Sequence, residues 1–220
     1  MKKILFSFVM LFFFVFLTGC SKENNWVNNK ESSKVFFIDE VKLSFEEAIN
    51  NYSNKNLKPV ALLGKQIVSG TNYMFLSKSE ENNKVKYSVV TVYKDLENNS
   101  TVKNFFDFDV SKYTNEDISL DQETMLGSWK VEIPSKPIML DEKVQSYFND
   151  ATSKIVGVTY YPIHLLAKKE NDGFNYAIIC YGKMSDLNST VGLFVLNIHV
   201  DNNDKSEIKN ISAVNLNEYN

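Results

Sequence analysis

Apolar runs separated by a short turn sequence mark residues 57–76. Branched and aliphatic side chains dominate residues 60–68, and a second apolar run occupies residues 73–76. The intervening Ser69, Gly70, Thr71 and Asn72 favour a tight turn, and Gly70 can take a positive φ without steric cost. This pattern predicts a β-hairpin that turns near Gly70.

A helical pattern precedes this hairpin. Ser44 and Glu47 have the spacing of a capping box, which predicts a helix beginning at Ser44. The apolar face of that helix recurs at helical intervals and consists of Phe45, Ala48, Ile49 and Tyr52. Residues 84–94 and 101–110 follow as further strand patterns, and residues 35–38 and 130–133 are candidates for additional edge strands.

The second half of the chain repeats the first. Adding 103 to the residue number carries Trp26 to Trp129, Phe45 to Phe148, Pro59 to Pro162 and Gly70 to Gly173. After a three-residue insertion the offset is 106, which carries Tyr113 to Tyr219. Agreement in type, order and spacing indicates a tandem duplication. Each copy then reads as one helix packed on an antiparallel sheet of about four strands, an α+β fold that we expect to fold as an independent unit.

The first residues have the layout of a secretory signal. Two lysines are followed by an apolar run, and the run ends in Leu17, Thr18, Gly19 and Cys20. This ending resembles the lipobox of bacterial lipoproteins, and the resemblance implies cleavage before Cys20 and lipidation of its sulfur. An uncleaved membrane anchor, or an ordinary signal with a chance cysteine, is the alternative.

These observations predict a division of the chain into five parts. They are a signal peptide at residues 1–19, a lipidated tether at 20–34, a first module at 35–113, a linker at 114–128 and a second module at 129–220. The expected location is the extracytoplasmic face of the cell membrane, held there by the lipid.

Composition narrows the classes of function. The chain carries 24 basic and 27 acidic residues, a net charge of −3, and every basic residue apart from histidine is Lys. An acidic chain without Arg is a poor candidate for nucleic-acid binding, which requires a basic face. Cys20 and Cys180 are the two cysteines, so lipidation of Cys20 would leave no disulfide within the chain.

The first predicted turn carries a family resemblance. The residues Gln66, Ile67, Val68, Ser69 and Gly70 match the Q-x-V-x-G signature of cystatins, and the order helix–strand–turn–strand is similar to the cystatin fold. The resemblance implies two tandem cystatin-like modules and inhibition of papain-like cysteine proteases, with these five residues as the first wedge. Residues 94–99 lack the Pro-Trp that cystatins place in the second turn, and residues 169–173 make the matching turn of the second copy charged.

The remaining candidates for chemistry favour structural roles. Cys180 lies in a strand pattern without a neighbouring base, and His164 and His199 have no common ligand set. Residues 201–204 resemble part of a Ca²⁺ loop but lack its glycine and distal Glu. Tyr160, Tyr161 and Phe174 lie near predicted turns and could form an exposed patch for a partner.

We therefore expect no catalytic residue, metal or cofactor. The predicted function is non-catalytic: a monomeric lipoprotein that binds a protein or cell-envelope polymer and no nucleic acid. The alternative is a membrane-tethered inhibitor of cysteine proteases. The turn formed by Gln66, Ile67, Val68, Ser69 and Gly70 is the candidate binding site in both cases.

Overall fold

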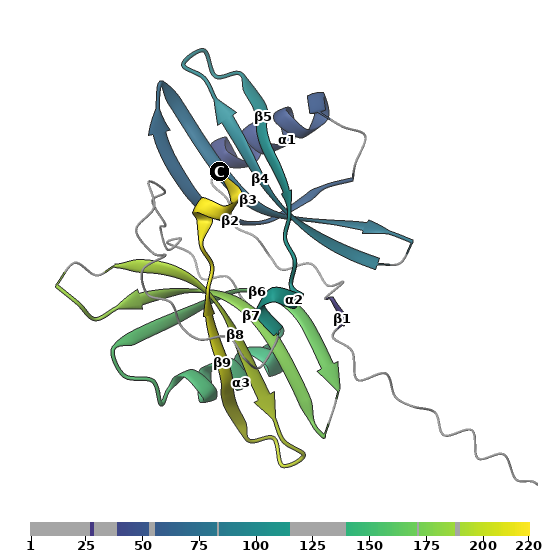
Figure 1. Cartoon of the computed structure of the whole chain (residues 1–220), viewed down its shortest axis with the longest axis vertical. Coiled ribbons are helices and arrows are strands. Elements are labelled where there is room, and N and C mark those ends of the chain that lie inside the picture. The colour runs from purple at the N-terminus through teal and green to yellow at the C-terminus, as the bar shows by residue number, and fades with distance from the viewer. Residues whose placement is uncertain are drawn as a thin grey trace, which may run out of the picture.

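The computed structural model describes residues 27–28, 39–52, 56–82, 84–114, 140–170, 172–187 and 190–220. Figure 1 shows two antiparallel sheets, one in each half of an elongated molecule. The first sheet has the order β2-β3-β4-β5, and the second has the order β1-β6-β7-β8-β9. The predicted segments at residues 1–26, 35–38 and 130–133, and all but the first residue of the predicted linker, lie outside the described residues. The five-part division of the chain stays a prediction.

The strands follow one another in meanders. The first sheet consists of β2 (Lys58–Val68), β3 (Gly70–Glu81), β4 (Lys84–Lys94) and β5 (Ser100–Asp107). The second consists of β6 (Val158–Glu170), β7 (Phe174–Met184), β8 (Val191–Val200) and β9 (Ser206–Ala213), and β1 (Val27–Asn28) pairs with the edge of β6. The helical elements are α1 (Asp39–Tyr52), α2 (Ser111–Thr114), α3 (Glu142–Thr152) and the 3-10 helix η2 (Leu216–Tyr219).

The α+β expectation is wrong at the level of fold class. The described residues are mostly β, with 55% in strands and 22% in helices, and two antiparallel sheets form the body of the molecule, each a four-stranded meander with β1 added at the edge of the second. The strands are long because apolar runs extend through β3, β4, β7 and β8, where most side chains are buried on both faces of the sheet.

The two sheets share their local irregularities at the sequence offset of the repeat. The β2–β3 pair has register shifts at Pro59/Ala61 and Leu62/Gly64, and the β6–β7 pair has them at Pro162/His164 and Leu165/Ala167. The shift at Thr91/Val92 between β4 and β5 recurs at Asn197/Ile198 between β8 and β9. Bulges bend a strand and increase its twist, and in the two sheets they lie at equivalent positions.

The last turn of each sheet is also built in the same way. Asp95 Oδ1 accepts from the backbone N–H of Glu97 at 2.9 Å and of Asn99 at 2.8 Å. Asp201 Oδ1 accepts from Asn203 N–H at 2.8 Å and Lys205 N–H at 2.9 Å. These bonds replace the ladder where each chain reverses direction.

Helix α1 begins at Asp39, five residues before the predicted start. Ser44 is therefore inside the helix, where its buried hydroxyl donates to the carbonyl oxygen of Glu40 at 2.9 Å. A serine inside a helix can hydrogen-bond to the carbonyl oxygen four residues earlier, so it fits the buried face of a helix as well as it fits an N-cap. For this reason the capping-box pattern placed the start of the helix incorrectly. Tyr52, expected on the apolar face, is half-exposed and stacks on Phe105.

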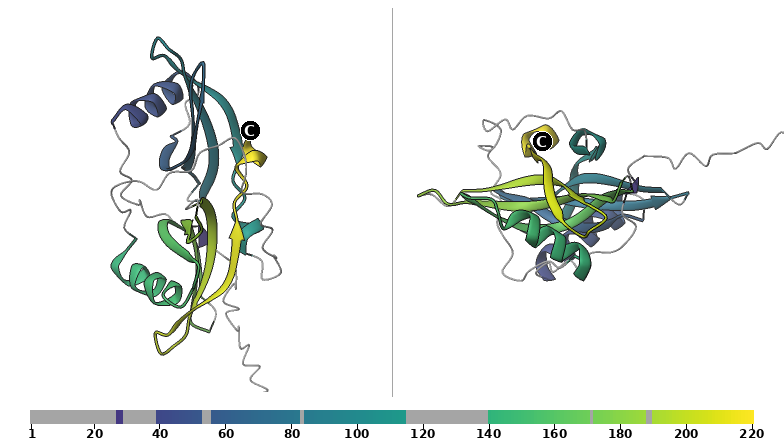
Figure 2. Two further views of the ribbon diagram at one scale, coloured as in Figure 1. Left: turned by 90° about the vertical axis from the view of Figure 1, so that its left-hand side faces the viewer. Right: turned by 90° about the horizontal axis from the view of Figure 1, so that it is seen from below.

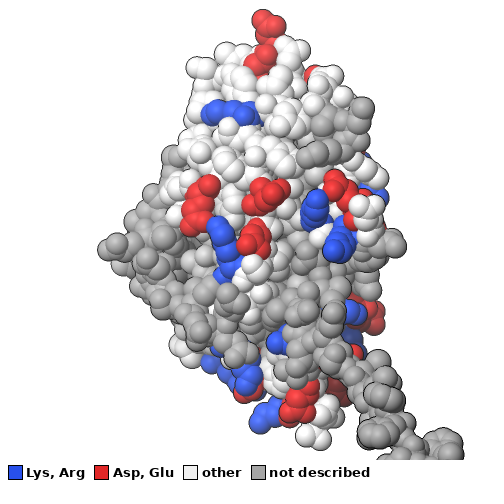
Figure 3. Space-filling view, turned by 45° about the vertical axis from the view of Figure 1, so that its right-hand side comes forward, with Lys and Arg blue, Asp and Glu red and all other residues white. Residues whose placement is uncertain are grey.

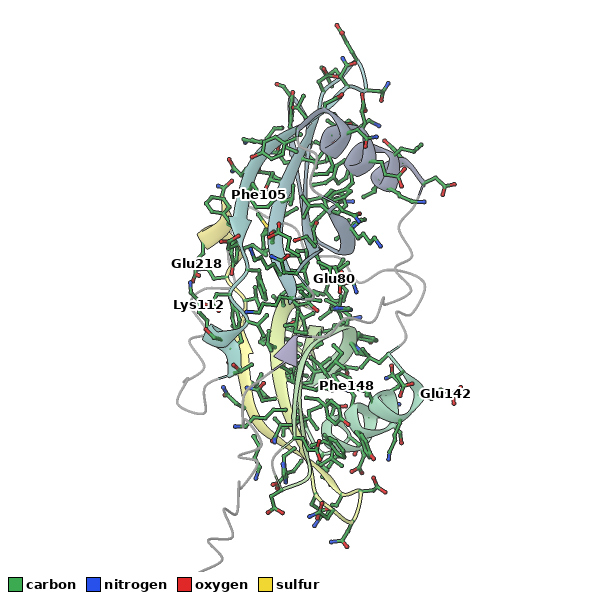
Figure 4. The ribbon with its side chains drawn as sticks, turned by 90° about the vertical axis from the view of Figure 1, so that its right-hand side faces the viewer. Glu80, Phe105, Lys112, Glu142, Phe148 and Glu218 are labelled. Carbon is green, nitrogen blue, oxygen red and sulfur yellow. The ribbon has the colours of Figure 1, made fainter. Side chains whose placement is uncertain are left out.

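Each long helix contributes apolar side chains to a local cluster. The ring centroids of Phe45 of α1 and Phe75 of β3 are 4.9 Å apart in an edge-to-face arrangement. In the second half Phe148 of α3 points toward the sheet, while Glu142 points away from the body (Figure 4). Asp141 caps α3 by accepting from Lys143 N–H at 3.0 Å.

A third cluster joins the two sheets. Side chains from both halves pack into one buried core at the middle of the molecule, with Leu63 and Leu76 on one side and Leu166 and Ile179 on the other. Figure 2 (left) shows α1 and α3 on one side of the sheets, with α2 and η2 on the opposite side. The central cluster is thus formed by the two sheets and the short helices α2 and η2, while the long helices α1 and α3 pack in the other two clusters.

Candidate functional site

The predicted binding turn is the exposed tip of the β2–β3 hairpin. Strand β2 ends at Val68, β3 begins at Gly70, and Ser69 lies at the reversal. The Ile67 side chain is 73% exposed and that of Val68 is 46% exposed. These two apolar side chains therefore project into solvent and do not pack into the core.

Hydrogen bonds hold this tip in one conformation. The Tyr93 hydroxyl of the neighbouring strand β4 donates to the carbonyl oxygen of Ser69. Asn72 Nδ2 donates to Gln66 Oε1 at 2.8 Å across the hairpin. Of the five residues singled out from sequence, Gln66 and Ser69 thus brace the turn, and Ile67 and Val68 form its surface.

Gly70 has a structural reason to be glycine. Its φ is +119°, and a Cβ at this position would collide with the carbonyl oxygen of Lys94. Gly173 of the second sheet, at φ +105°, would collide with the carbonyl oxygen of Val200. The shared glycine therefore follows from close backbone approach in both hairpins and carries no information about binding.

A second turn lies at the same end of the first sheet. Thr71 at the start of β3 pairs with Lys94 at the end of β4, so the β4–β5 turn follows directly beside the β2–β3 turn. Leu96 in that turn is 81% exposed. We call the exposed apolar residues Ile67, Val68 and Leu96 the first-sheet tip. This end is at the top of Figures 1 and 3; in Figure 3 acidic atoms lie at its extremity, and uncharged atoms cover most of the surface just below them.

Leu96 was not among the residues predicted for the site. The pattern of this segment predicts a polar turn, because Asp95 and residues 97–100 are charged or hydroxyl- and amide-bearing. The sequence feature that could have indicated Leu96 is its isolation, because a lone leucine in a polar turn has no evident role in the core. The structure brings the leucine to the same end of the sheet as Ile67 and Val68.

The second sheet has different residues at the equivalent end. Glu170 takes the position of Ile67, and Asn202 takes the position of Leu96. Asn202 Nδ2 donates to Asp172 Oδ1 at 3.2 Å, which joins the two polar turns. Phe174 is 42% exposed there and stacks on Tyr176.

The aromatic patch suggested by the sequence is not assembled. Tyr161 pairs with Tyr181 and Phe174 pairs with Glu170, so the two lie toward opposite ends of the β6–β7 pair. Tyr160 packs edge-to-face on Phe194 at a centroid distance of 5.6 Å.

The candidate nucleophile and one histidine are in the interior. Cys180 is fully buried, burial raises the pKa of its thiol, and Sγ lies 3.6 Å from the carbonyl oxygen of Phe194. His164 is also fully buried, and its Nε2 pairs with the Tyr87 hydroxyl at 3.0 Å. Burial, with a smaller effect of the Lys78 ammonium, lowers the pKa of His164 to about 3. Both groups are neutral at ordinary pH, and each is surrounded by packed side chains.

The acidic side chains of the β8–β9 turn accept hydrogen bonds from other groups of the same chain. Asp201 accepts backbone N–H groups, and Asp204 accepts from the Tyr147 hydroxyl. These bonds lower the pKa of both carboxyls. Among the described residues, no group of three or more His, Cys, Asp or Glu side chains is placed to hold a metal ion.

Comparison with known proteins gives no relative. The chain matches no protein family, and no curated protein is significantly similar to it. Within the part of the chain that the structure describes, none of the helices has the length and apolar character needed to cross a bilayer.

Proposed function

We propose that this protein is a lipid-anchored, non-catalytic binding protein on the extracytoplasmic face of the cell membrane. Its first-sheet tip contacts another protein. The observation that carries this proposal is the exposure of Ile67, Val68 and Leu96 on two adjacent turns. Apolar side chains grouped at a rigid protrusion favour insertion into an apolar cleft of a partner.

The duplicated half supplies an internal comparison. The second sheet reverses direction at the equivalent places with Glu170 and Asn202 at the positions of Ile67 and Leu96. The β4–β5 and β8–β9 turns have the same hydrogen bonds and the same positive φ at Asn98 and Asp204, so the backbone of this turn does not require an apolar residue. Apolar side chains at the first tip lower solubility and add nothing to the packed core, which supports a role in binding.

The bracing of the tip favours tight binding. The Tyr93–Ser69 and Asn72–Gln66 bonds order the hairpin before a partner arrives. A preordered surface loses less conformational entropy on association than a flexible loop does. A protein partner fits these residues better than a polar wall polymer, because Ile67, Val68 and Leu96 are apolar and exposed.

The test compares two exposed leucines. Leu96→Asp, combined with Ile67→Asp, replaces the two most exposed apolar residues of the tip, while Leu187→Asp makes the same leucine change at a fully exposed position on the β7–β8 turn. Immobilised residues 21–220 and the Leu187 variant should capture the same envelope protein. The tip variant should lose it. Identical capture by all three proteins would contradict the proposal.

Cysteine-protease inhibition is the second candidate. The observation that favours it is the placement of two turns at one end of a sheet, as a two-turn wedge requires. Papain assayed with the same three proteins tests it, and Ile67→Asp with Leu96→Asp should raise the inhibition constant by about a hundredfold if the tip enters the cleft. Gly70 is unsuitable for this test, because any side chain there disturbs the hairpin itself. Absence of inhibition by wild type at micromolar concentration would eliminate this candidate.

The anchor is tested separately. We expect Cys20→Ala to abolish incorporation of a fatty-acid analogue, because the thiol is the acceptor of the diacylglyceryl group. The replacement should release the protein from the membrane fraction or leave it as an uncleaved precursor. Label incorporation that equals wild type would contradict the lipoprotein assignment.

A further inference from the structure

The contact between the two sheets is built from equivalent residues of the two copies. Its buried core contains Val60 with Ile163, Leu63 with Leu166, Leu76 with Ile179, Val89 with Val195, Val110 with Leu216, and Tyr113 with Tyr219. Each of these pairs is related by the offset of the repeat. The interface therefore has the form of a two-fold symmetric dimer contact enclosed within one chain.

The segments that follow the last strand of each half cross to the other half. Tyr219 of η2 packs its ring against Phe106 and Phe108 of the first half, at centroid distances of 6.2 and 6.0 Å. Tyr113 of α2 presents its carbonyl oxygen to Asn197 Nδ2 of β8 at 2.7 Å. The Tyr113 and Tyr219 hydroxyls lie 3.3 Å apart where the two segments meet.

The polar contacts of Tyr87 break the symmetry of this core. The Tyr87 hydroxyl meets His164 Nε2 at 3.0 Å and donates to the carbonyl oxygen of Leu166 at 3.2 Å. The residues equivalent to Tyr87 and His164 in the other copy are Leu193 and Ala61, which have no polar side-chain atom. The hydrogen bond between Tyr87 of the first half and His164 of the second therefore has no counterpart between Leu193 and Ala61.

A second hydrogen bond links the two halves. The Tyr181 hydroxyl donates to the carbonyl oxygen of Leu62 at 2.7 Å, and the residue equivalent to Tyr181 is Lys78, whose ammonium is also a donor, so this bond does not by itself distinguish the halves. Two copies of the second half placed together would bring the buried His164 ring opposite Leu193. The ring would then lose its hydroxyl partner, at a cost that disfavours pairing of like halves.

We infer that the interface is a recognition surface through which the first half selects the second. It holds the two halves together without the covalent connection, and the contact of Tyr87 with His164 makes it specific for the unlike pair. The partner that this surface fits is therefore the other half of the chain, and a second copy of residues 140–220 would leave the His164 ring without the Tyr87 hydroxyl.

The test cuts the mature chain, residues 21–220, at a protease site inserted between residues 115 and 139. Size-exclusion chromatography with light scattering over a dilution series then measures the affinity of the two fragments. We expect the cut protein to elute at the size of the uncut chain at micromolar concentration. Separation of the fragments at that concentration would overturn the inference.

Two matched variants test the specificity. Tyr87→Phe removes only the hydroxyl that meets His164 and Leu166, and should weaken association by on the order of tenfold to a hundredfold. Tyr147→Phe removes a hydroxyl that bonds to Asp204 within the second half, and should leave association unchanged. Equal affinities for the two variants would overturn the role given to the Tyr87 contact.

Discussion

His164 shows how a single buried group makes stability depend on pH. The ring lies between the two halves, where the Tyr87 hydroxyl pairs with Nε2 and the Lys78 ammonium is the nearby charge. Protonating it would bury an imidazolium beside a like charge. The fold therefore keeps the ring neutral, and its pKa falls from 6.5 to about 3.

This shift predicts acid sensitivity above the range where carboxylates titrate. Because the folded-state pKa is depressed, the neutral ring contributes stability that is complete above pH 6.5 and is lost as the pH falls toward 3. Between pH 6.5 and 5 we expect the free energy of unfolding to fall by about 1.5 kcal/mol from this group. Urea titrations at several pH values measure it.

His164→Gln serves as the control for that measurement. Glutamine offers a polar atom to Tyr87 but does not titrate, so the variant should have a flatter stability profile between pH 6.5 and 5. Parallel profiles for the variant and wild type would show that another group is responsible.

At the scale of elements, three glycines with positive φ allow two destabilising effects of an added side chain to be compared. These effects are a steric clash with a neighbouring strand and the unfavourable backbone conformation alone. Gly70 and Gly173 have positive φ, and a Cβ on either would collide with a carbonyl oxygen of the neighbouring strand. Gly157 has φ +90°, but a Cβ added there would meet no atom within 4 Å. It is therefore a control for the cost of positive φ alone.

We expect Gly157→Ala to lower the free energy of unfolding by about 1–2 kcal/mol. Gly70→Ala and Gly173→Ala should each lower it by about 3 kcal/mol or more, because strand β4 or β8 must also move. Chemical denaturation of the three variants measures the difference. If Gly157→Ala lowered the free energy of unfolding as much as the other two replacements do, the positive φ alone would account for the destabilisation.

Sequence patterns predicted the local elements better than their relations in space. Gly70 marked the first hairpin, and the offset of 103 marked its counterpart, because turn chemistry and strand alternation are local properties. The start of α1 was wrong because Ser44 suits an N-cap and a packed helical face alike. The predicted fold class was wrong because it gave the one long helix of each half too much weight against long buried strands.

The candidate site was predicted in part. The turn from Gln66 to Gly70 was located, but Leu96 joined it only through the pairing of Thr71 with Lys94. The contact of Tyr87 with His164 joins residues 77 positions apart. No local pattern encodes such a pairing, so the interface between the halves could not be read from the sequence.

At the scale of the whole molecule, the shared core changes what the duplication implies. A repeat with its own helix and sheet suggests that residues 129–220 fold alone. In the structure, however, Leu166, Ile179 and Val195 are fully buried within the core that also holds residues of the first half. Removing the first half would expose this apolar surface to water.

We therefore expect the isolated fragment of residues 129–220 to be much less stable than the whole chain. Burial of each large aliphatic side chain contributes about 1.5–3 kcal/mol, and a domain has only about 5–15 kcal/mol of net stability, so losing several such contacts leaves little. Circular dichroism at low micromolar concentration should show a urea midpoint well below that of residues 21–220, or no cooperative transition. A matching fragment of residues 35–113 should behave in the same way, because Leu63, Leu76 and Val89 lose the same core. Midpoints equal to that of the whole chain would show that each half is a self-sufficient domain.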